Sequence, residues 1–168
     1  MLDPFGTAAD RFRLPATGPT DDMHPGWPES TPFVRLPASA VFPSGARMRL
    51  RPLLRSDGHE WRRQRIEDES FLRSVEPTQA APWAAAHSQQ AWWNHLMYLR
   101  TAAREALVVP LVIEVEGQFV GQITLGNIQH GSIRDCWIGY WVYSAIHGAG
   151  VATACLLYTS DAADDSLR

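Results

Sequence analysis

The chain has 168 residues, of which 45% are hydrophobic and 20% are charged, and its formal net charge is -3. This length and composition are typical of one globular domain, and the mild acidity disfavours the basic surface with which proteins bind nucleic acids directly. No apolar run approaches the roughly 18 residues of a membrane-spanning helix, and the start shows no signal-peptide pattern. We therefore expect a cytoplasmic protein with neither a nucleic-acid nor a membrane partner.

The residues that commonly bind metals are few and scattered. The two cysteines, Cys136 and Cys155, cannot form a disulfide framework or a four-ligand zinc site. Four histidines show no ligand spacing with cysteine or acidic residues: His59, His87, His95 and His130. We therefore expect no metal site.

Residues 1–45 form a proline-rich zone without apolar periodicity, and eight of the twelve prolines lie in it. Because proline lacks a backbone N–H and fixes φ, this zone disfavours a helix or a central strand. We predict an extended or disordered N-terminal arm, in which Met23 is a possible alternative start.

Residues 155–165 read CLLYTSDAADD, and the amphipathic pattern upstream stops where this run begins. The run resembles the translation of a transposase-type sequencing adapter. We predict that 155–168 is a non-native tail, that the native sequence is interrupted after Ala154, and that a C-terminal part is missing. A genuine acidic tail is the alternative.

Residues 46–154 carry the predicted elements. Apolar residues alternate with arginines over 46–54, which predicts a half-buried strand with a charged outer face. A weakly periodic helix follows, from an N-cap at Ser56-Asp57 to Arg73. A second helix is better marked, because Ser88 can cap it and apolar residues recur at helical spacing at Trp92, Leu96, Leu99 and Ala103.

From residue 107 the pattern changes to strands. Two β-rich runs, 108–115 and 119–125, flank the turn Glu116-Gly117 and predict an antiparallel hairpin. A polar loop is predicted over 127–131 and a fourth strand over 136–143, in which Gly139 indicates a bulge or a close backbone approach. The predicted order is β-α-α-β-β-β, followed by a glycine turn and the first residues of a helix.

One segment has the composition of a ligand site: His147, Gly148, Ala149, Gly150, Val151, Ala152 and Thr153. Small residues allow successive backbone N–H groups to point into one concavity, and a following helix N-terminus adds partial positive charge, which suits a pyrophosphate. The dinucleotide fingerprint would need glycine where Thr153 stands and a parallel βαβ unit. A helix start without a ligand is the alternative.

The element order and this turn resemble the GCN5-related N-acetyltransferase (GNAT) family. The acyl-CoA signature of that family, Q/R-x-x-G-x-G/A, matches HGAGVA from Gly150 to Ala152, with His147 in place of the usual Gln or Arg. LRPL at 50–53, EPT at 76–78, and IGYWV at 138–142 followed by GVATA at 150–154 resemble its ribosomal-protein alanine acetyltransferase branch, the RimJ/RimL type. The resemblance covers 46–154 and implies an α+β, three-layer fold, with a mixed, mostly antiparallel sheet flanked by helices.

The resemblance also implies an activity, the transfer of acetyl from acetyl-CoA to a primary amine such as the N-terminal alanine of a ribosomal protein. Acetyl-CoA contacts are expected at Tyr140, Trp141, Val142 and the turn 147–153, where a backbone N–H near Trp141 or Val142 would bind the thioester carbonyl. Glu76 is the candidate acceptor of the amine proton, and a solvated loop carboxylate is the alternative.

The predicted loss of the C-terminal part would leave one edge of the fourth strand unpaired and the truncated chain inactive. Three other interpretations remain open: a catalytically inactive acyl-CoA-binding remnant, an acetyltransferase for small-molecule amines of the antibiotic type, and a dinucleotide-binding module. The sequence does not predict the oligomeric state.

Overall fold

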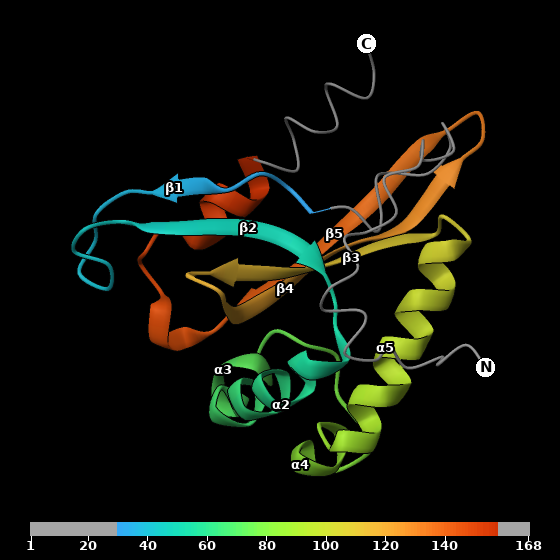
Figure 1. The fold of residues 1–168 in the computed structure, drawn as a ribbon. Coiled ribbons are helices and arrows are strands. Elements are labelled where there is room, and N and C mark those ends of the chain that lie inside the picture. The colour runs from blue at the N-terminus through green and yellow to red at the C-terminus, as the bar shows by residue number, and fades with distance from the viewer. Residues whose placement is uncertain (1–29, 158–168) are drawn as a thin grey trace.

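The structure is a computed structural model that describes residues 30–157 (Figure 1). Its centre is a five-stranded sheet in the order β1-β2-β3-β4-β5, in which each neighbouring pair is antiparallel. The strands are β1 (Val34–Leu36), β2 (Ala46–Pro52), β3 (Val108–Val115), β4 (Gln118–His130) and β5 (Arg134–Val142). The predicted first strand, hairpin and fourth strand are therefore confirmed, with shifted ends.

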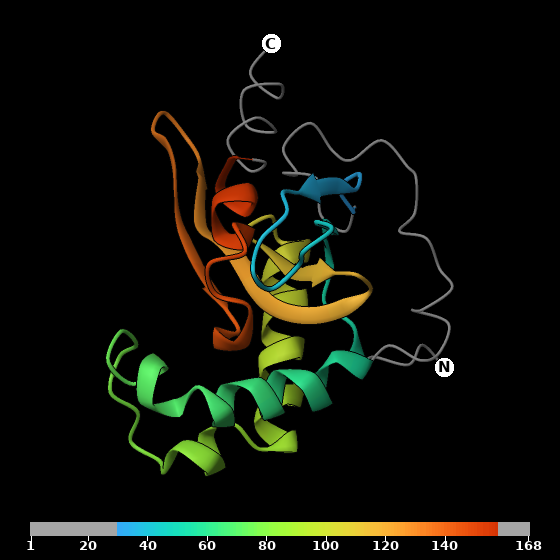
Figure 2. The same ribbon diagram turned by 90° about the vertical axis from the view of Figure 1, so that its left-hand side faces the viewer.

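One face of the sheet is covered by helices (Figures 1 and 2). They are a 3-10 turn η1 (Arg55–Asp57), α2 (Gly58–Glu67), α3 (Glu69–Leu72), α4 (Trp83–Ala86) and α5 (Gln89–Arg104). The predicted cap of α5 is present, since Ser88 Oγ accepts the N–H of Ala91 at 3.2 Å. The predicted apolar stripe of α5 is buried and packs with Val108 and Val112 of β3.

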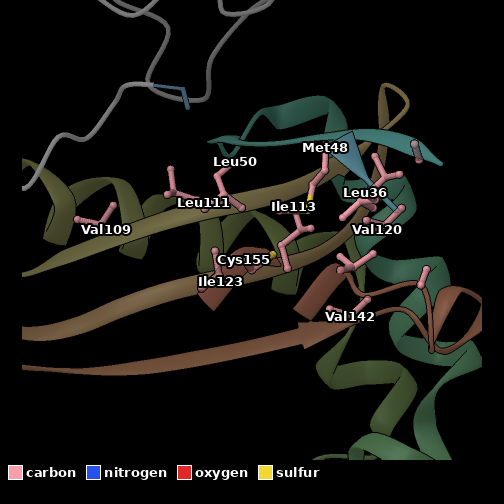
Figure 3. Packing of buried hydrophobic residues seen from close by; sticks show 14 residues of the cluster. Leu36, Met48, Leu50, Val109, Leu111, Ile113, Val120, Ile123, Val142 and Cys155 are labelled. Atoms are coloured by element: carbon pink, nitrogen blue, oxygen red, sulfur yellow. The ribbon is translucent and has the colours of Figure 1, made fainter. Parts of the chain in front are cut away.

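The other face of the sheet carries a second apolar cluster (Figure 3). Its members on β3 are the residues that alternate with Val108 and Val112, because successive strand side chains point to opposite faces. This cluster is covered by Ala149 of the turn after β5 and by Val151 and Cys155 of the helix that spans the described residues 151–157. The sheet thus lies between two layers, which confirms the predicted three-layer α+β fold.

Five details of the predicted fold differ. β1 lies inside the zone predicted as an arm and adds an edge strand, with Leu36 buried in the core. The short helix α4 has no counterpart among the predicted elements. The predicted loop 127–131 is wrong up to His130, because β4 continues there past a register shift between Gly126 and Gln129, and Asn127 adopts a φ of 52°. Asparagine tolerates this left-handed conformation better than most residues.

The fourth difference concerns Gly139, which pairs regularly with Thr124, so that the bulge lies on β4 instead. The predicted alternative, a close backbone approach, is not what the structure shows: the atoms nearest to a Cβ on Gly139 belong to the ring of Trp137, at 2.9 Å.

The start of the first helix is also built differently from the prediction. Asp57 does not cap α2 with its side chain. Its carboxylate instead accepts the backbone N–H of Leu54 at 2.7 Å and binds the guanidinium of Arg51 at 2.8 and 2.9 Å. The predicted cap residue therefore ties the helix start to β2.

At the other end of the predicted domain, residues 155–157 continue the helix, and Cys155 is fully buried. Residues 158–168, and with them most of the predicted tail, lie outside the described residues, as do residues 1–29 of the predicted arm.

Candidate active site

A cavity of about 510 Å³ lies between the helical layer and the strands β4 and β5. Its floor is the sheet face that carries Gln122, Thr124 and Trp141, and Gln122 is the cross-strand partner of Trp141. Its walls come from α2, from the segment 76–79 and from the start of α5. A concave site with a few polar groups among aromatic side chains is the usual geometry of a small-molecule or substrate site.

The candidate base Glu76 lines this cavity, as do Tyr140 and Trp141. The Glu76 carboxylate accepts a hydrogen bond from the guanidinium of Arg65 at 2.5 Å. Arg65 is 7% exposed, and its guanidinium carbon lies 5.3 to 5.7 Å from the ring centres of Trp61, Trp83 and Trp141. The three indoles hold the arginine, which in turn holds Glu76 in the wall.

Two histidines without a predicted role also line the cavity. His87 is 2% exposed, and its Nδ1 lies 2.8 Å from the carbonyl oxygen of Trp83. His95 projects from α5, with its Nε2 at 3.3 Å from Oε1 of Gln122. Burial is the main cause that lowers the pKa of both imidazoles, so both are neutral near pH 7. The only sequence signal for His95 is its position beside the apolar stripe of α5.

The predicted pyrophosphate turn follows the end of β5, and its residues do not line this cavity. Gly148 and Gly150 have φ values of 80° and 76°, and a Cβ on either would meet no described atom within 4 Å. The first hydrogen bond of the following helix runs from Ala154 N–H to the carbonyl of Gly150. The amides of 151–153 therefore precede the hydrogen-bonded ladder of the helix, as a backbone anion site requires.

Ala149 and Val151 of the turn have a structural position, since they are 1% and 2% exposed and belong to the core. Ala149 N–H donates to the carbonyl of Ile146 at 3.3 Å. His147 Nε2 lies 3.0 Å from the carbonyl oxygen of Val142, and its ring meets Phe71 edge-on. The side chain of His147 thus ties the turn to the end of β5.

The turn is also anchored to the helical layer. The 3-10 turn η2 (Ser144–Ile146) begins at Ser144, whose N–H and hydroxyl both donate to the carboxylate of Asp68, the former at 2.9 Å. Asp68 is 3% exposed and lies between α2 and α3. One buried carboxylate therefore connects the cavity wall to the start of the segment that leads to the turn.

The two candidate oxyanion donors on β5 can be distinguished by strand geometry. The N–H of Tyr143 donates to Val120 on β4, and the carbonyl of Trp141 also faces β4, beside Gly121. Because backbone polar groups alternate in direction along a strand, the N–H groups of Tyr140 and Val142 point away from β4. Among the described residues no strand pairs with that edge of β5. Val142, and not Trp141, therefore presents its amide to an extended ligand there.

Within the described range 30–157, no group of three histidine, cysteine or acidic residues is arranged to hold a metal ion. No helix in that range is long and apolar enough to cross a membrane.

The chain matches no protein-family model and no curated protein. Solved structures give clear similarities. RimJ of Mycobacterium smegmatis, in complex with CoA-disulfide, has a TM-score of 0.77 and 38% identity, covering 86% of this chain and 66% of that chain. The ribosomal-protein-S5-alanine acetyltransferase of Vibrio fischeri has a TM-score of 0.59 and 18% identity, covering 76% of this chain and 66% of that chain.

A third similar structure is RimL, a ribosomal alpha-N-protein acetyltransferase in complex with coenzyme A. It has a TM-score of 0.54 and 16% identity, and the match covers 74% of this chain and 67% of that chain. This chain spans about two thirds of the length of each of these three proteins. The fold is common to all three, and the identity with RimJ extends over most of the present chain. The chain belongs to the GCN5-related N-acetyltransferase family and resembles its RimJ/RimL branch.

Proposed function

We propose that the protein transfers the acetyl group of acetyl-CoA to a primary amine, and that this amine is the N-terminal alanine amine of a ribosomal protein. The observation that carries the proposal is the joint placement of three features: the edge of β5 at Val142 that no described strand covers, the glycine turn at its end, and the cavity beside it. The 38% identity with a CoA-bound RimJ supports the same cofactor, and the names of the similar structures support the substrate class.

This edge of β5, free of other strands within residues 30–157, suits the pantetheine of acetyl-CoA, whose amides can pair with a strand as an additional strand does. The amide of Val142 would donate to the thioester carbonyl and stabilise the oxyanion that forms on it, an effect worth about 3 kcal/mol for one preorganised donor. The turn at Gly148 and Gly150 and the amides of 151–153 would receive the pyrophosphate. Tyr140 and Trp141 would flank the acyl group at the cavity.

The amine would enter the cavity and attack the thioester after losing a proton. That Glu76 accepts this proton stays a prediction. Its position in the cavity supports the assignment, whereas its ion pair with Arg65 occupies the carboxylate.

The cofactor site is tested by a charge placed in the turn. Gly150→Glu should weaken CoA binding at least about 100-fold in calorimetry, which corresponds to about 2.7 kcal/mol, because a carboxylate would lie against the pyrophosphate. Gly117→Glu is the matched control: Gly117, in the β3–β4 turn, has a φ of 78° and equally open surroundings, so backbone strain and added charge are the same. Equal CoA affinity in both variants would contradict the proposed site.

The substrate is tested by release of CoA thiol and by mass spectrometry. A peptide with the N-terminus of a ribosomal protein that begins with alanine should gain one acetyl group, and the same peptide with a blocked N-terminus should gain none. Transfer to small amines alone would favour the antibiotic-type alternative. Binding of CoA without transfer to any amine would favour an inactive remnant, and competition by a nicotinamide dinucleotide would favour the dinucleotide-binding alternative.

A further inference from the structure

His95 lies at the junction between the helical layer and the floor of the cavity. It projects from α5, and its ring stacks on Trp61 of α2 with the ring centres 5.7 Å apart. Its Nε2 lies 3.3 Å from Oε1 of Gln122, the cross-strand partner of Trp141. The imidazole therefore lies beside the Gln122–Trp141 pair. Trp141 directly precedes Val142, whose amide would bind the thioester carbonyl.

Two floor residues determine which nitrogen of His95 carries the proton. The side-chain Nε2 of Gln122 donates to Oγ1 of Thr124 at 3.1 Å, which orients the amide so that its Oε1 faces His95. An amide oxygen only accepts hydrogen bonds, so the neutral imidazole must donate from Nε2. The lone pair of Nδ1 is then the proton-accepting position, and Gln122 and Thr124 act as positioning residues.

The groups around His95 keep its imidazole neutral. Burial is the main cause that lowers its pKa, and the charge of Arg65 on α2 and the nearby His87 act in the same direction. The hydrogen bond with Gln122 on β4 and the charge of Glu76 act in the opposite direction but do not outweigh burial. A neutral imidazole in a cavity accepts protons at neutral pH.

The other carboxylate and the other imidazole of the cavity are engaged elsewhere. Glu76 is paired with Arg65 at 2.5 Å, and Nδ1 of the almost fully buried His87 lies 2.8 Å from the carbonyl of Trp83. We infer that His95, oriented by Gln122 and Thr124, takes the proton that the substrate ammonium loses before it attacks the thioester. The inference rests on the proposed acetyl transfer and names a catalytic residue for it.

Atoms and charges balance over the transfer. The ammonium gives one proton to Nδ1 of His95, and the resulting amine nitrogen forms the bond to the acyl carbon. The C–S bond breaks, and its electron pair leaves on the sulfur of coenzyme A. A second proton from the nitrogen neutralises that thiolate, the third remains on the new amide, and His95 returns its proton to the solvent.

The test is the pH profile of kcat/KM for wild type and His95→Gln, with His59→Gln as the matched control, because the His59 side chain is 83% exposed on α2. We expect wild type and the control to lose activity below an apparent pKa under about 6.5, the ordinary value for histidine. His95→Gln should lose about 100-fold or more in kcat/KM, and its pH profile should lack this decrease at acidic pH, the acid limb. Its CoA affinity should stay within about twofold of wild type, because residue 95 does not belong to the glycine turn that would bind the pyrophosphate.

Glu76→Gln separates the two candidate acceptors. If that variant loses the acid limb while His95→Gln keeps it, the inference is overturned and Glu76 is the acceptor. An unchanged rate and profile in His95→Gln likewise overturns the inference but leaves the proposed function intact. A wild-type protein that binds CoA and acetylates no amine would instead contradict the proposed function itself.

A titration of the wild-type protein keeps the inference testable if His95→Gln does not fold. The imidazole resonances of His95, followed by NMR, should titrate at the same midpoint as the acid limb of kcat/KM. Different midpoints would overturn the assignment.

Discussion

Glu114 lies near the end of the buried strand β3, with its carboxylate between two guanidinium groups of β2. Arg49 donates to one carboxylate oxygen at 2.6 Å and Arg51 to the other at 2.5 Å. Arg51 continues the network to Asp57 at the start of the helical layer. The arginines expected on an outer, solvated face of the first strand thus form, at these two positions, a partly buried ion-pair network.

The pH dependence of stability follows from this network. Burial alone would raise the pKa of Glu114, but the hydrogen bonds and charges of Arg49 and Arg51 outweigh burial, so that its pKa lies below the ordinary value. A lowered pKa contributes stability that is complete above the unfolded-state pKa, about 4.3, and is lost as the pH falls through the folded-state value. Glu114→Gln should therefore lower the free energy of unfolding by about 3 kcal/mol at pH 7.

Urea unfolding of wild type and Glu114→Gln at pH 7 and at steps below the unfolded-state pKa measures this effect. The difference between the two proteins should shrink as the pH falls. Glu105→Gln is the control, because Glu105 follows α5 and is exposed. A difference that does not change with pH would contradict the linkage to Glu114.

At the scale of the elements, one carboxylate couples two parts of the proposed active site. Asp68 binds the N–H and hydroxyl of Ser144 and so fixes the segment between β5 and the glycine turn. Asp68→Asn would lose part of this pairing, so the segment would be less ordered before CoA binds. The conformational entropy lost when the segment becomes ordered would then weaken CoA binding. We expect the Kd for CoA to rise about tenfold, or about 1.4 kcal/mol, with a smaller change in kcat.

Glu69→Gln is the control for Asp68, because Glu69 is the next residue, is only partly buried and pairs only with the exposed Arg73 among the described contacts. Calorimetry with CoA gives the Kd, and thermal unfolding without CoA reports general destabilisation. If Asp68→Asn lowers kcat and leaves the Kd for CoA unchanged, Asp68 does not act through the turn.

The elements that could be predicted from the sequence are those with a clear local pattern. α5 and β2 bury side chains at a regular period, β3 is an apolar run that is buried throughout, and the Ser88 cap marks a helix start. β5 was predictable from its aromatic and β-branched residues, although most of its described residues are exposed. β1 has three residues and α4 has four, which is too short for a period to be visible. Asn127 does not distinguish a loop from a bulged strand, because its preference for a left-handed conformation is the same in both.

The site was predictable only in part, for a related reason. The glycine turn is a local feature of composition, and Glu76, Tyr140 and Trp141 came from the family resemblance. The contact between His95 and Gln122 joins residues 27 positions apart on a helix and a strand, and it exists only once α5 packs on the sheet. A single sequence does not show which residues of a helix and a strand face each other. The contact of His95 with Gln122 could therefore not be predicted from the sequence.

At the scale of the whole molecule, one sheet supports both layers. Side chains of β3 alternate between the helical cluster and the cluster that includes Ala149, Val151 and Cys155. The described tryptophans belong to the helices or to β5 and lie in the helical cluster or around the cavity. Because β3 is buried on both faces, unfolding of one layer exposes its side chains on that face and destabilises the sheet on which the other layer packs. We therefore expect residues 30–157 to unfold as one cooperative unit.

Val151→Ala tests this cooperativity from the face that lacks the described tryptophans. Val151 is 2% exposed, and its truncation should cost about 2 kcal/mol, which lowers Tm by roughly 4–8 °C in a domain of this size. In a Trp27→Phe background, which removes the tryptophan outside the described residues, fluorescence and far-UV circular dichroism should shift together. Leu157→Ala is the control on the same helix, because Leu157 is 62% exposed and its truncation should change Tm little. A shift in circular dichroism without a shift in fluorescence would show that the two layers unfold separately.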